Sequence, residues 1–232
     1  MSVTQTKAES KAAAKCWSCH APVDGQHFCP ACGKVQPLAA DTDHFAFLGL
    51  PKKVTLDPAS LEEQFHKLSW KLHPDNFVRS SEYERDLSLE RSSQLNDAYR
   101  TLREPVARIE YLLLHLGLRK EGTKKQQAPP ELLEEVFELN ESLDELREAR
   151  AGGGDLSSLR ERLGAAQKHF QQKLAELDGE LAAVGREWDA ALDANADESK
   201  RAALLARMNE ILNRRSYIRN LVASVANELA EV

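Results

Sequence analysis

The chain has 232 residues, a formal net charge of −6 and only 6% aromatic residues, and Ala, Leu, Glu, Arg and Lys dominate after the first fifty positions. This composition favours helices, because the β-branched residues that a sheet requires are scarce. Acidic residues outnumber basic ones in 41–118 and in 119–232, which argues against a nucleic-acid partner, since phosphate binding requires a clustered basic face.

The first fifteen residues, MSVTQTKAESKAAAK, contain no apolar stretch and no arginine, and they include Glu9. A secretory signal and a mitochondrial presequence are therefore both disfavoured. No apolar run in the chain approaches the roughly 18 residues of a membrane span, so no membrane partner is expected. We expect a disordered N-terminus at 1–15 and a cytoplasmic protein.

All four cysteines lie within the stretch CWSCHAPVDGQHFCPAC, as two CxxC pairs: Cys16 with Cys19, and Cys29 with Cys32. Two such turns can present four thiolates to one tetrahedral ion, at about 2.3 Å per bond for zinc. Closed four-cysteine sites are usually structural. The spacing therefore predicts a zinc-binding module with one structural ion over 16–40, stabilised by the metal because the segment has few apolar residues.

Other interpretations of these cysteines are open at this point. Disulfides are disfavoured in a cytoplasmic chain, and a redox dithiol of Cys29 and Cys32 lacks the surrounding βαβ pattern. Iron in place of zinc is compatible with the same ligands. The nearby His20 and His27 are expected to be bystanders, because four thiolates already complete the shell. The helical cores share nothing obvious with this segment, so we expect them to melt independently of it.

An amphipathic helix is predicted before the sequence WKLHPDNF. Its apolar residues recur at i, i+4, i+7 and i+11: Leu61, Phe65, Leu68 and Leu72. Ser60 and Glu63 have the spacing of a capping box that would begin the helix. The opposite face carries Lys67 and Lys71, with Trp70 beside them and its ring expected to point outward.

The helix must end near Leu72, because a residue that precedes proline disfavours the α region and Pro74 follows His73. Asp75 is placed to cap backbone amides in the turn. A second long helix follows, with an apolar face through QLNDAYRTL. The sequence therefore predicts two antiparallel helices with HPD at their tip. A catalytic dyad of His73 and Asp75 is disfavoured, because no nucleophile, orienting group or glycine-rich anion loop is nearby.

These motifs together resemble a J-domain, and residues 43–117, above all REPVARIEYLLL, resemble the HscB family of iron–sulfur-cluster co-chaperones. The CWSC…CPAC element resembles the zinc-binding extension of some eukaryotic-type members. The resemblance implies that the chain binds an HscA- or DnaK-type chaperone and stimulates its ATPase. In that role, His73, Pro74 and Asp75 match the essential tripeptide.

Two lysines before the tripeptide, Lys67 and Lys71, would steer docking to the chaperone, because complementary charge acts mainly on association rate and specificity. The alternative is that they form an ordinary solvated face. Asn76 replaces the lysine or arginine that often follows HPD in J-domains, which removes one positive charge from the docking edge.

The remaining chain is predicted to form separate segments. We expect a J-domain over 41–118, a polar linker over 119–130 that ends in Pro-Pro, and an antiparallel three-helix bundle over 131–232. In the bundle, Asp155 would cap the second helix and a third would begin near Asp197. The expected fold class is all-α, with the zinc knuckle in front of the J-domain hairpin and the bundle.

The first bundle helix has more apolar residues than its core needs. The core stripe is expected to contain Leu132, Val136, Leu139, Leu143 and Leu146. Leu133 and Phe137 point to another side, in a row with Glu141 and Glu145 and bordered by Glu138. Exposed apolar residues ringed by carboxylates predict a protein-binding patch. The alternative is that this face packs on the J-domain.

The family resemblance implies that this face binds the cluster scaffold protein IscU, and that Tyr217 in RRSYIRN matches a contributing aromatic of the last helix. Glu134 stands where the family can have a larger apolar residue. We therefore expect a co-chaperone without catalytic activity that brings a cluster-loaded scaffold to its chaperone. A general J-domain adaptor that recruits other clients is the main alternative, and a redox protein is another. A eukaryotic source would place the protein in the mitochondrial matrix instead.

Overall fold

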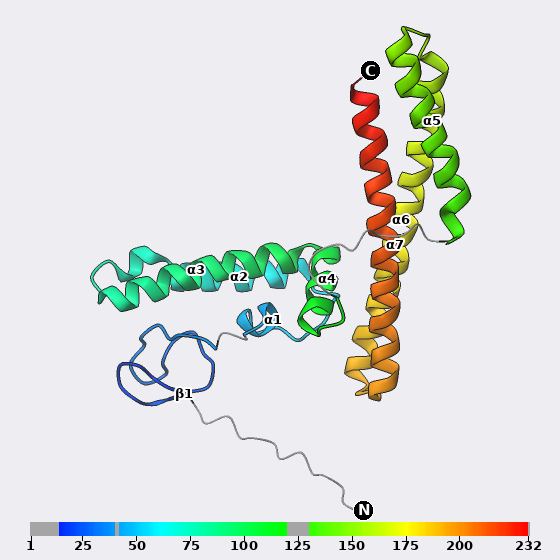
Figure 1. Ribbon diagram of the computed structural model, residues 1–232. Coiled ribbons are helices and arrows are strands. Elements are labelled where there is room, and N and C mark those ends of the chain that lie inside the picture. The colour runs from blue at the N-terminus through cyan, green and yellow to red at the C-terminus, as the bar shows by residue number, and fades with distance from the viewer. Residues whose placement is uncertain (1–13, 40–41, 120–129, 232) are drawn as a thin grey trace, which may run out of the picture. The chain divides into compact units, whose positions relative to one another are not determined.

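The computed structural model describes residues 14–39, 42–119 and 130–231 (Figure 1). These residues form seven α-helices, two short 3-10 helices and one two-stranded antiparallel ladder. The predicted all-α fold class is confirmed. The expected disordered N-terminus and the expected linker lie almost entirely outside the described residues. None of the described helices has the length and apolar character needed to cross a membrane.

The described chain divides into two compact units. The first comprises the described parts of Met1–Pro51 and Asp57–Arg103, and the second those of Lys52–Leu56 and Glu104–Val232. The elements of the first unit are β1 (Ala14–Lys15), β2 (Pro22–Val23), α1 (His44–Phe47), α2 (Pro58–Leu72), the 3-10 helix η1 (Pro74–Phe77) and α3 (Glu82–Arg103). We call residues 14–39 the knuckle and residues 73–77 the HPD loop.

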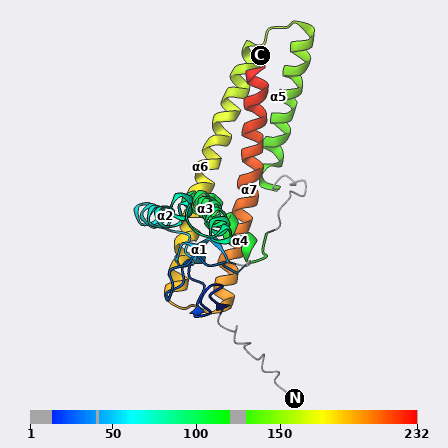
Figure 2. The ribbon, with the colours of Figure 1, turned by 90° about the vertical axis from the view of Figure 1, so that its left-hand side faces the viewer.

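Helices α2 and α3 run side by side as the predicted antiparallel hairpin (Figures 1 and 2). Buried apolar side chains from α1, α2 and α3 form its core, among them Phe45, Leu61, Leu72, Leu95 and Leu102. The start of α2 differs from the prediction. Asp57, not Ser60, is the N-cap, and its Oδ2 accepts from the Ser60 amide at 2.9 Å. Pro58 explains the shift, because its fixed φ and missing N–H favour the first helical position directly after an aspartate cap.

The second unit contains α4 (Pro105–His115), the 3-10 helix η2 (Pro130–Leu132), α5 (Leu133–Gly152), α6 (Ser157–Asp193) and α7 (Glu198–Ala230). Helices α6 and α7 form a long antiparallel pair, and α5 packs along one half of α6 (Figure 1). The last helix begins where it was predicted, next to Asp197, which is its N-cap and accepts from the Lys200 amide at 2.8 Å. The predicted cap of the second bundle helix is wrong: Leu156 is the N-cap of α6 and makes no side-chain cap bond, and Asp155 lies one residue earlier, where it accepts from the Ser157 amide at 2.9 Å.

A short segment before α2, Lys52–Leu56, is anchored on α6 within the second unit. The carboxylate of Asp189 accepts from the backbone amides of Val54 and Thr55, at 2.8 and 2.7 Å. The contact is close enough to require a glycine, because a Cβ on Gly185 would lie 2.8 Å from Cγ2 of Val54. Asp189 is therefore a buried acceptor that holds a connecting segment on the bundle.

Replacing this carboxylate should destabilise the second unit. We expect Asp189→Ala to lower the free energy of unfolding by about 2 to 3 kcal/mol, because the buried Val54 amide loses its acceptor. Asp193→Ala is the matched control on the same helix. Its carboxylate pairs with Lys53 at 2.6 Å but is largely exposed, so it should cost less than about 1 kcal/mol. Urea unfolding followed by circular dichroism measures both, and equal losses would contradict the assignment.

Candidate functional site

The four cysteine sulfurs of the knuckle lie together. Sγ of Cys16 is 3.6 Å from that of Cys32, Sγ of Cys19 is 3.6 Å from that of Cys29, and all four lie within 4.8 Å of one another. Sulfurs on a tetrahedron with zinc bonds of about 2.3 Å would be about 3.8 Å apart. None of the four is in a disulfide. The predicted cluster is confirmed, and its geometry fits one metal ion.

Each CxxC pair is closed by the same backbone turn. The amide of His20 donates to the carbonyl of Cys16 at 3.0 Å, and the amide of Gly33 donates to that of Cys29 at 2.9 Å. Both residues have positive φ, 63° and 72°. Glycine adopts this region freely, whereas His20 does so with a side chain. The two matching turns direct both cysteine pairs to one point.

Hydrogen bonds to sulfur favour the thiolate that a metal requires. Sγ of Cys16 accepts from the Ser18 amide and from Nε2 of Gln36, each at 3.3 Å. Burial raises the pKa of the Cys16 thiol, but hydrogen bonds from the backbone amides of Cys19 and Ser18 outweigh it, and the pKa falls to about 6. Gln36 supports a ligand in this way, a role that sequence reasoning missed.

The two knuckle histidines lie outside the cysteine cluster. His20 is exposed, whereas the His27 ring packs on Phe47 of α1 and donates from Nε2 to its carbonyl at 2.8 Å. Burial lowers the pKa of His27, since it disfavours the imidazolium. His27 therefore joins the knuckle to α1.

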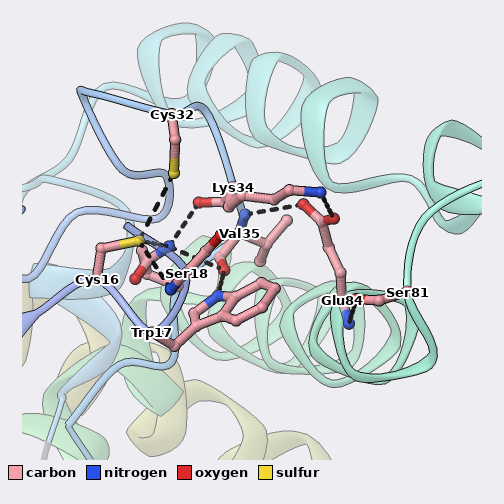
Figure 3. A network of polar contacts seen from close by, with 9 residues as sticks. Cys16, Trp17, Ser18, Cys32, Lys34, Val35, Ser81 and Glu84 are labelled. Carbon is pink, nitrogen blue, oxygen red and sulfur yellow. Dashed lines mark hydrogen bonds and ion pairs between the residues drawn. The ribbon is translucent and has the colours of Figure 1, made fainter. Parts of the chain in front are cut away.

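The premise that the helical cores share nothing with the knuckle is wrong. Figure 3 shows the ion pair between Lys34 and the buried Glu84 of α3, with Nζ 2.5 Å from Oε2. The Val35 amide donates to the other oxygen of Glu84 at 3.4 Å. Farther along α3, Nε of Arg91 donates to the carbonyl of Gln36 at 3.2 Å. The knuckle thus supplies partners for two charges buried in the hairpin.

The HPD loop is an exposed, hydrogen-bonded turn. His73 is extended, and its Nδ1 accepts from the Asp75 amide at 3.3 Å. His73 is therefore the cap of this turn, and the predicted capping role of Asp75 is wrong. The side chain of Asp75 is 84% exposed. Asn76 does more than remove a positive charge from the docking edge, because its Nδ2 donates to the carbonyl of Trp70 at 2.7 Å. Asn76 therefore ties the loop to the last turn of α2.

The outer face of α2 exposes Trp70 and the two predicted lysines. Trp70 is 76% exposed, as predicted. Lys67 pairs with Glu63 on the same helix at 2.7 Å, whereas Lys71 is exposed and forms no ion pair with any described residue. Lys67 and Lys71, both predicted to steer docking, thus differ in how much unpaired charge they present to a partner.

Helix α5 presents the predicted apolar residues to solvent. Leu133 is 56% and Phe137 72% exposed, and all five predicted core residues are buried: Leu132, Val136, Leu139, Leu143 and Leu146. The three predicted carboxylates of this face differ in their surroundings. Glu145 pairs with Arg162 of α6 at 2.8 Å, while Glu138 and Glu141 line a groove between α5 and α6.

The last predicted residue, Tyr217, lies half-buried on α7. Burial raises the pKa of its hydroxyl, so it presents a neutral phenol. The groove between α5 and α6 is also lined by Ala165, Ala166 and Phe170, and by the basic side chains of Arg162 and His169 on α6. The second unit therefore offers two exposed apolar residues on α5 and a groove with acidic side chains on α5 and basic ones on α6.

The family model and two curated relatives that match this chain name the same family. A family model described as "HSCB C-terminal oligomerisation domain" matches residues 128–226. The "Co-chaperone protein HscB homolog" of Vibrio vulnificus (strain YJ016) is 35% identical over 170 residues, 73% of this chain and 94% of that protein. The homolog of Aliivibrio salmonicida is 38% identical over 139 residues, 60% of this chain and 80% of that protein.

A solved structure shows the same fold. The crystal structure of human co-chaperone protein HscB covers 94% of this chain and 100% of that chain, with a TM-score of 0.63 and 23% sequence identity.

Proposed function

The chain belongs to the HscB family of co-chaperones, and we propose that it delivers an IscU-type iron–sulfur scaffold to an HscA- or DnaK-type chaperone and stimulates the ATPase of that chaperone. Transfer of the cluster to acceptor proteins would follow. The single observation that best supports this proposal is the HPD loop, which presents His73 and Asp75 to solvent from a turn fixed by backbone hydrogen bonds.

Such a loop suits a protein that acts by binding. A co-chaperone accelerates hydrolysis by favouring one conformation of its partner through differential affinity. The Asn76 amide donates to the His73 carbonyl at 3.0 Å, and the Asn76 side chain donates to the Trp70 carbonyl of α2. The loop is therefore already ordered, so it loses little conformational entropy on docking. Pro74 fixes the backbone between the two functional side chains. Lys67 and Lys71 would add electrostatic steering, mostly through Lys71, since Glu63 already neutralises Lys67.

The second unit would bind the scaffold through the exposed face of α5. Leu133 and Phe137 form its apolar centre, because exposed large apolar residues on a stable helix favour partner binding. Glu138 and Glu141 form an acidic rim, so the partner surface should carry basic side chains. Glu145, paired with Arg162, would contribute less than sequence predicts. Tyr217 on α7 would complete the surface.

We assign one zinc ion to the four cysteines. Four thiolates with tetrahedral spacing are the ligand set of closed structural zinc sites. Cys16, Cys19, Cys29 and Cys32 would hold it, and the ion would supply structural stability only. Such free thiolates fit a reducing compartment, which for a bacterial protein is the cytoplasm. The protein would have no catalytic activity of its own.

Steady-state ATP turnover by a DnaK-type chaperone tests the proposal. The chain alone should stimulate hydrolysis, and an IscU-type scaffold should increase the stimulation further. The alternative is a general J-domain adaptor, which would give the same stimulation with unfolded client proteins and show no binding to the scaffold. Calorimetric titration with the scaffold separates the two functions, and an absence of stimulation under both conditions would refute both.

Truncating the centre of the α5 face should weaken scaffold binding more than folding. We expect Phe137→Ala to reduce affinity by about 2 kcal/mol, about thirtyfold, because a central anchor loses its contact area. Leu132→Ala is the matched control, since Leu132 is buried in the bundle core and should lower the melting temperature instead. If Phe137→Ala lowers the melting temperature and leaves affinity unchanged, the face packs within the protein.

The acidic rim should mainly affect the rate at which the scaffold associates. Glu141→Gln should slow association, and added salt should shrink the difference from the wild type. Glu145→Gln is the internal comparison and should change the rate less, because Arg162 already pairs with that carboxylate. Stopped-flow association at two salt concentrations measures both.

A further inference from the structure

One side of α3 carries polar residues that form hydrogen bonds with other segments of the first unit. They recur at i, i+4, i+7 and i+8: Glu84, Ser88, Arg91 and Ser92. Glu84 is 3% exposed and Arg91 2%. Burial of charged groups is costly unless they are paired and hydrogen-bonded. Their partners lie in two places, the knuckle and the end of α2.

The knuckle supplies the partners of Glu84. Lys34 and the Val35 amide contact its two carboxylate oxygens. Trp17 supports Val35, because its indole N–H donates to the Val35 carbonyl at 2.6 Å (Figure 3). The Trp17 ring also packs edge-to-face on Tyr83 of α3, with ring centroids 4.9 Å apart. The contact thus includes apolar surface as well as charge.

Gln36 joins the metal-ligand cluster to the second charge. It is buried, its Nε2 donates to Sγ of Cys16, and its carbonyl accepts from Arg91. Groups that donate to a ligating sulfur orient that ligand and are themselves fixed by it. One residue therefore connects a predicted zinc ligand to α3.

The other two α3 residues hold the start of the HPD loop. Oγ of Ser88 and Oγ of Ser92 both donate to the carbonyl of Leu72, at 2.8 and 2.9 Å. Leu72 is the last residue of α2, where carbonyls lack helical partners, and His73 follows it directly. The same turns of α3 that contact the knuckle therefore fix the backbone at the entry to the loop.

We propose that Gln36, Glu84 and Arg91 are positioning residues through which the metal-bound knuckle holds α3 and, by way of Leu72, the HPD loop. The part of this inference that concerns chaperone stimulation rests on the proposed function. A loop that is held in place exists more often in its binding-competent form, and apparent affinity falls in proportion when that population falls. The knuckle then acts on the chaperone step without touching the chaperone.

Two disrupting variants of the full, zinc-loaded chain, each with a control variant, test this inference. Arg91→Met removes the donor to Gln36, and Arg100→Met on the exposed side of α3 is its matched control. Lys34→Met removes the partner of Glu84, and Lys34→Arg should restore it. All four keep the cysteines, so elemental analysis should find one zinc per chain throughout. Lys34 is partly exposed, and the Val35 amide still donates to Glu84 when Lys34 is replaced, so we expect Lys34→Met to stay folded even if Arg91→Met does not.

The first measurement is amide hydrogen exchange without chaperone. Exchange of the Asp75 and Asn76 amides should become several-fold faster in Arg91→Met and Lys34→Met, and should stay at the wild-type rate in Arg100→Met and Lys34→Arg. The second is chaperone ATPase against co-chaperone concentration. The half-maximal concentration should rise several-fold in the two disrupting variants while the maximal rate is unchanged.

Unchanged exchange at Asp75 and Asn76 in folded Lys34→Met would overturn the inference. So would a rise in half-maximal concentration that Lys34→Arg does not reverse. If the wild-type chain gives no stimulation at all, the proposed function fails instead, and the exchange rates still decide whether the knuckle holds the loop.

Discussion

Removing the metal from the zinc-loaded chain should unfold the knuckle and lower the melting temperature of the α2–α3 hairpin. Binding to four thiolates contributes about 10–16 kcal/mol in comparable peptides. The apolar cluster of Cys16, Val23, Cys29 and Ala21 is too small to replace it. Glu84 and Arg91 of the hairpin would then lose their hydrogen bonds to the knuckle and be hydrated by water instead. A net loss of about 2 kcal/mol corresponds to roughly 10 °C in a domain of this size.

Chelation and the double substitution Cys16→Ser with Cys19→Ser should give the same result. The Trp17 indole N–H reports the knuckle by NMR, because its bond to the Val35 carbonyl exists only in the folded form. Exchange of α3 amides reports the hairpin, and exchange of α6 amides is the internal control. Adding chelator to the double variant should change nothing more. A hairpin that melts at the same temperature with and without metal would show that the knuckle contacts contribute no stability.

The features that sequence predicted correctly are periodic or closely spaced. The apolar stripe that ends at Leu72 and the proline at 74 determine where α2 ends, because the helix repeat and the restriction before proline act over a few residues. The core of α5 follows from the same periodicity, and the exposure of Leu133 and Phe137 follows from what that core leaves out. The cysteine cluster needs only two short turns at a fixed separation.

The features that sequence did not predict depend on partners far along the chain. Glu84 and Arg91 look like ordinary surface charges of a helix, and only the folded knuckle, about fifty positions earlier, makes them buried. The pairing of Glu145 with Arg162 requires the relative rotation of α5 and α6. No local pattern encodes these distances. A signal was available in one case: Pro58 after an aspartate marks the start of α2 more strongly than Ser60 does.

Changing His73 or Asp75 in the HPD loop should abolish chaperone stimulation. We expect His73→Gln and Asp75→Asn each to cost about 3 kcal/mol or more in the complex with the chaperone, at least about a hundredfold in apparent affinity. A hydrogen-bonded charge that contacts a partner leaves that partner's buried group unpaired when it is removed. Neither change should unfold the hairpin, because the side chains of His73 and Asp75 are 55% and 84% exposed and lie outside its core.

Two controls separate this docking role from a structural one. Scaffold affinity should be unchanged in both variants, because that surface is proposed on α5. Asn76→Ala should reduce stimulation only in part, since it frees the loop from the Trp70 carbonyl but leaves His73 and Asp75 in place. Asp75→Asn keeps the size of the side chain and removes only its charge, so the assay compares charge directly with shape. Full stimulation by Asp75→Asn would mean that the carboxylate is not a chaperone contact, and the proposed mechanism of stimulation would then be wrong at its central residue.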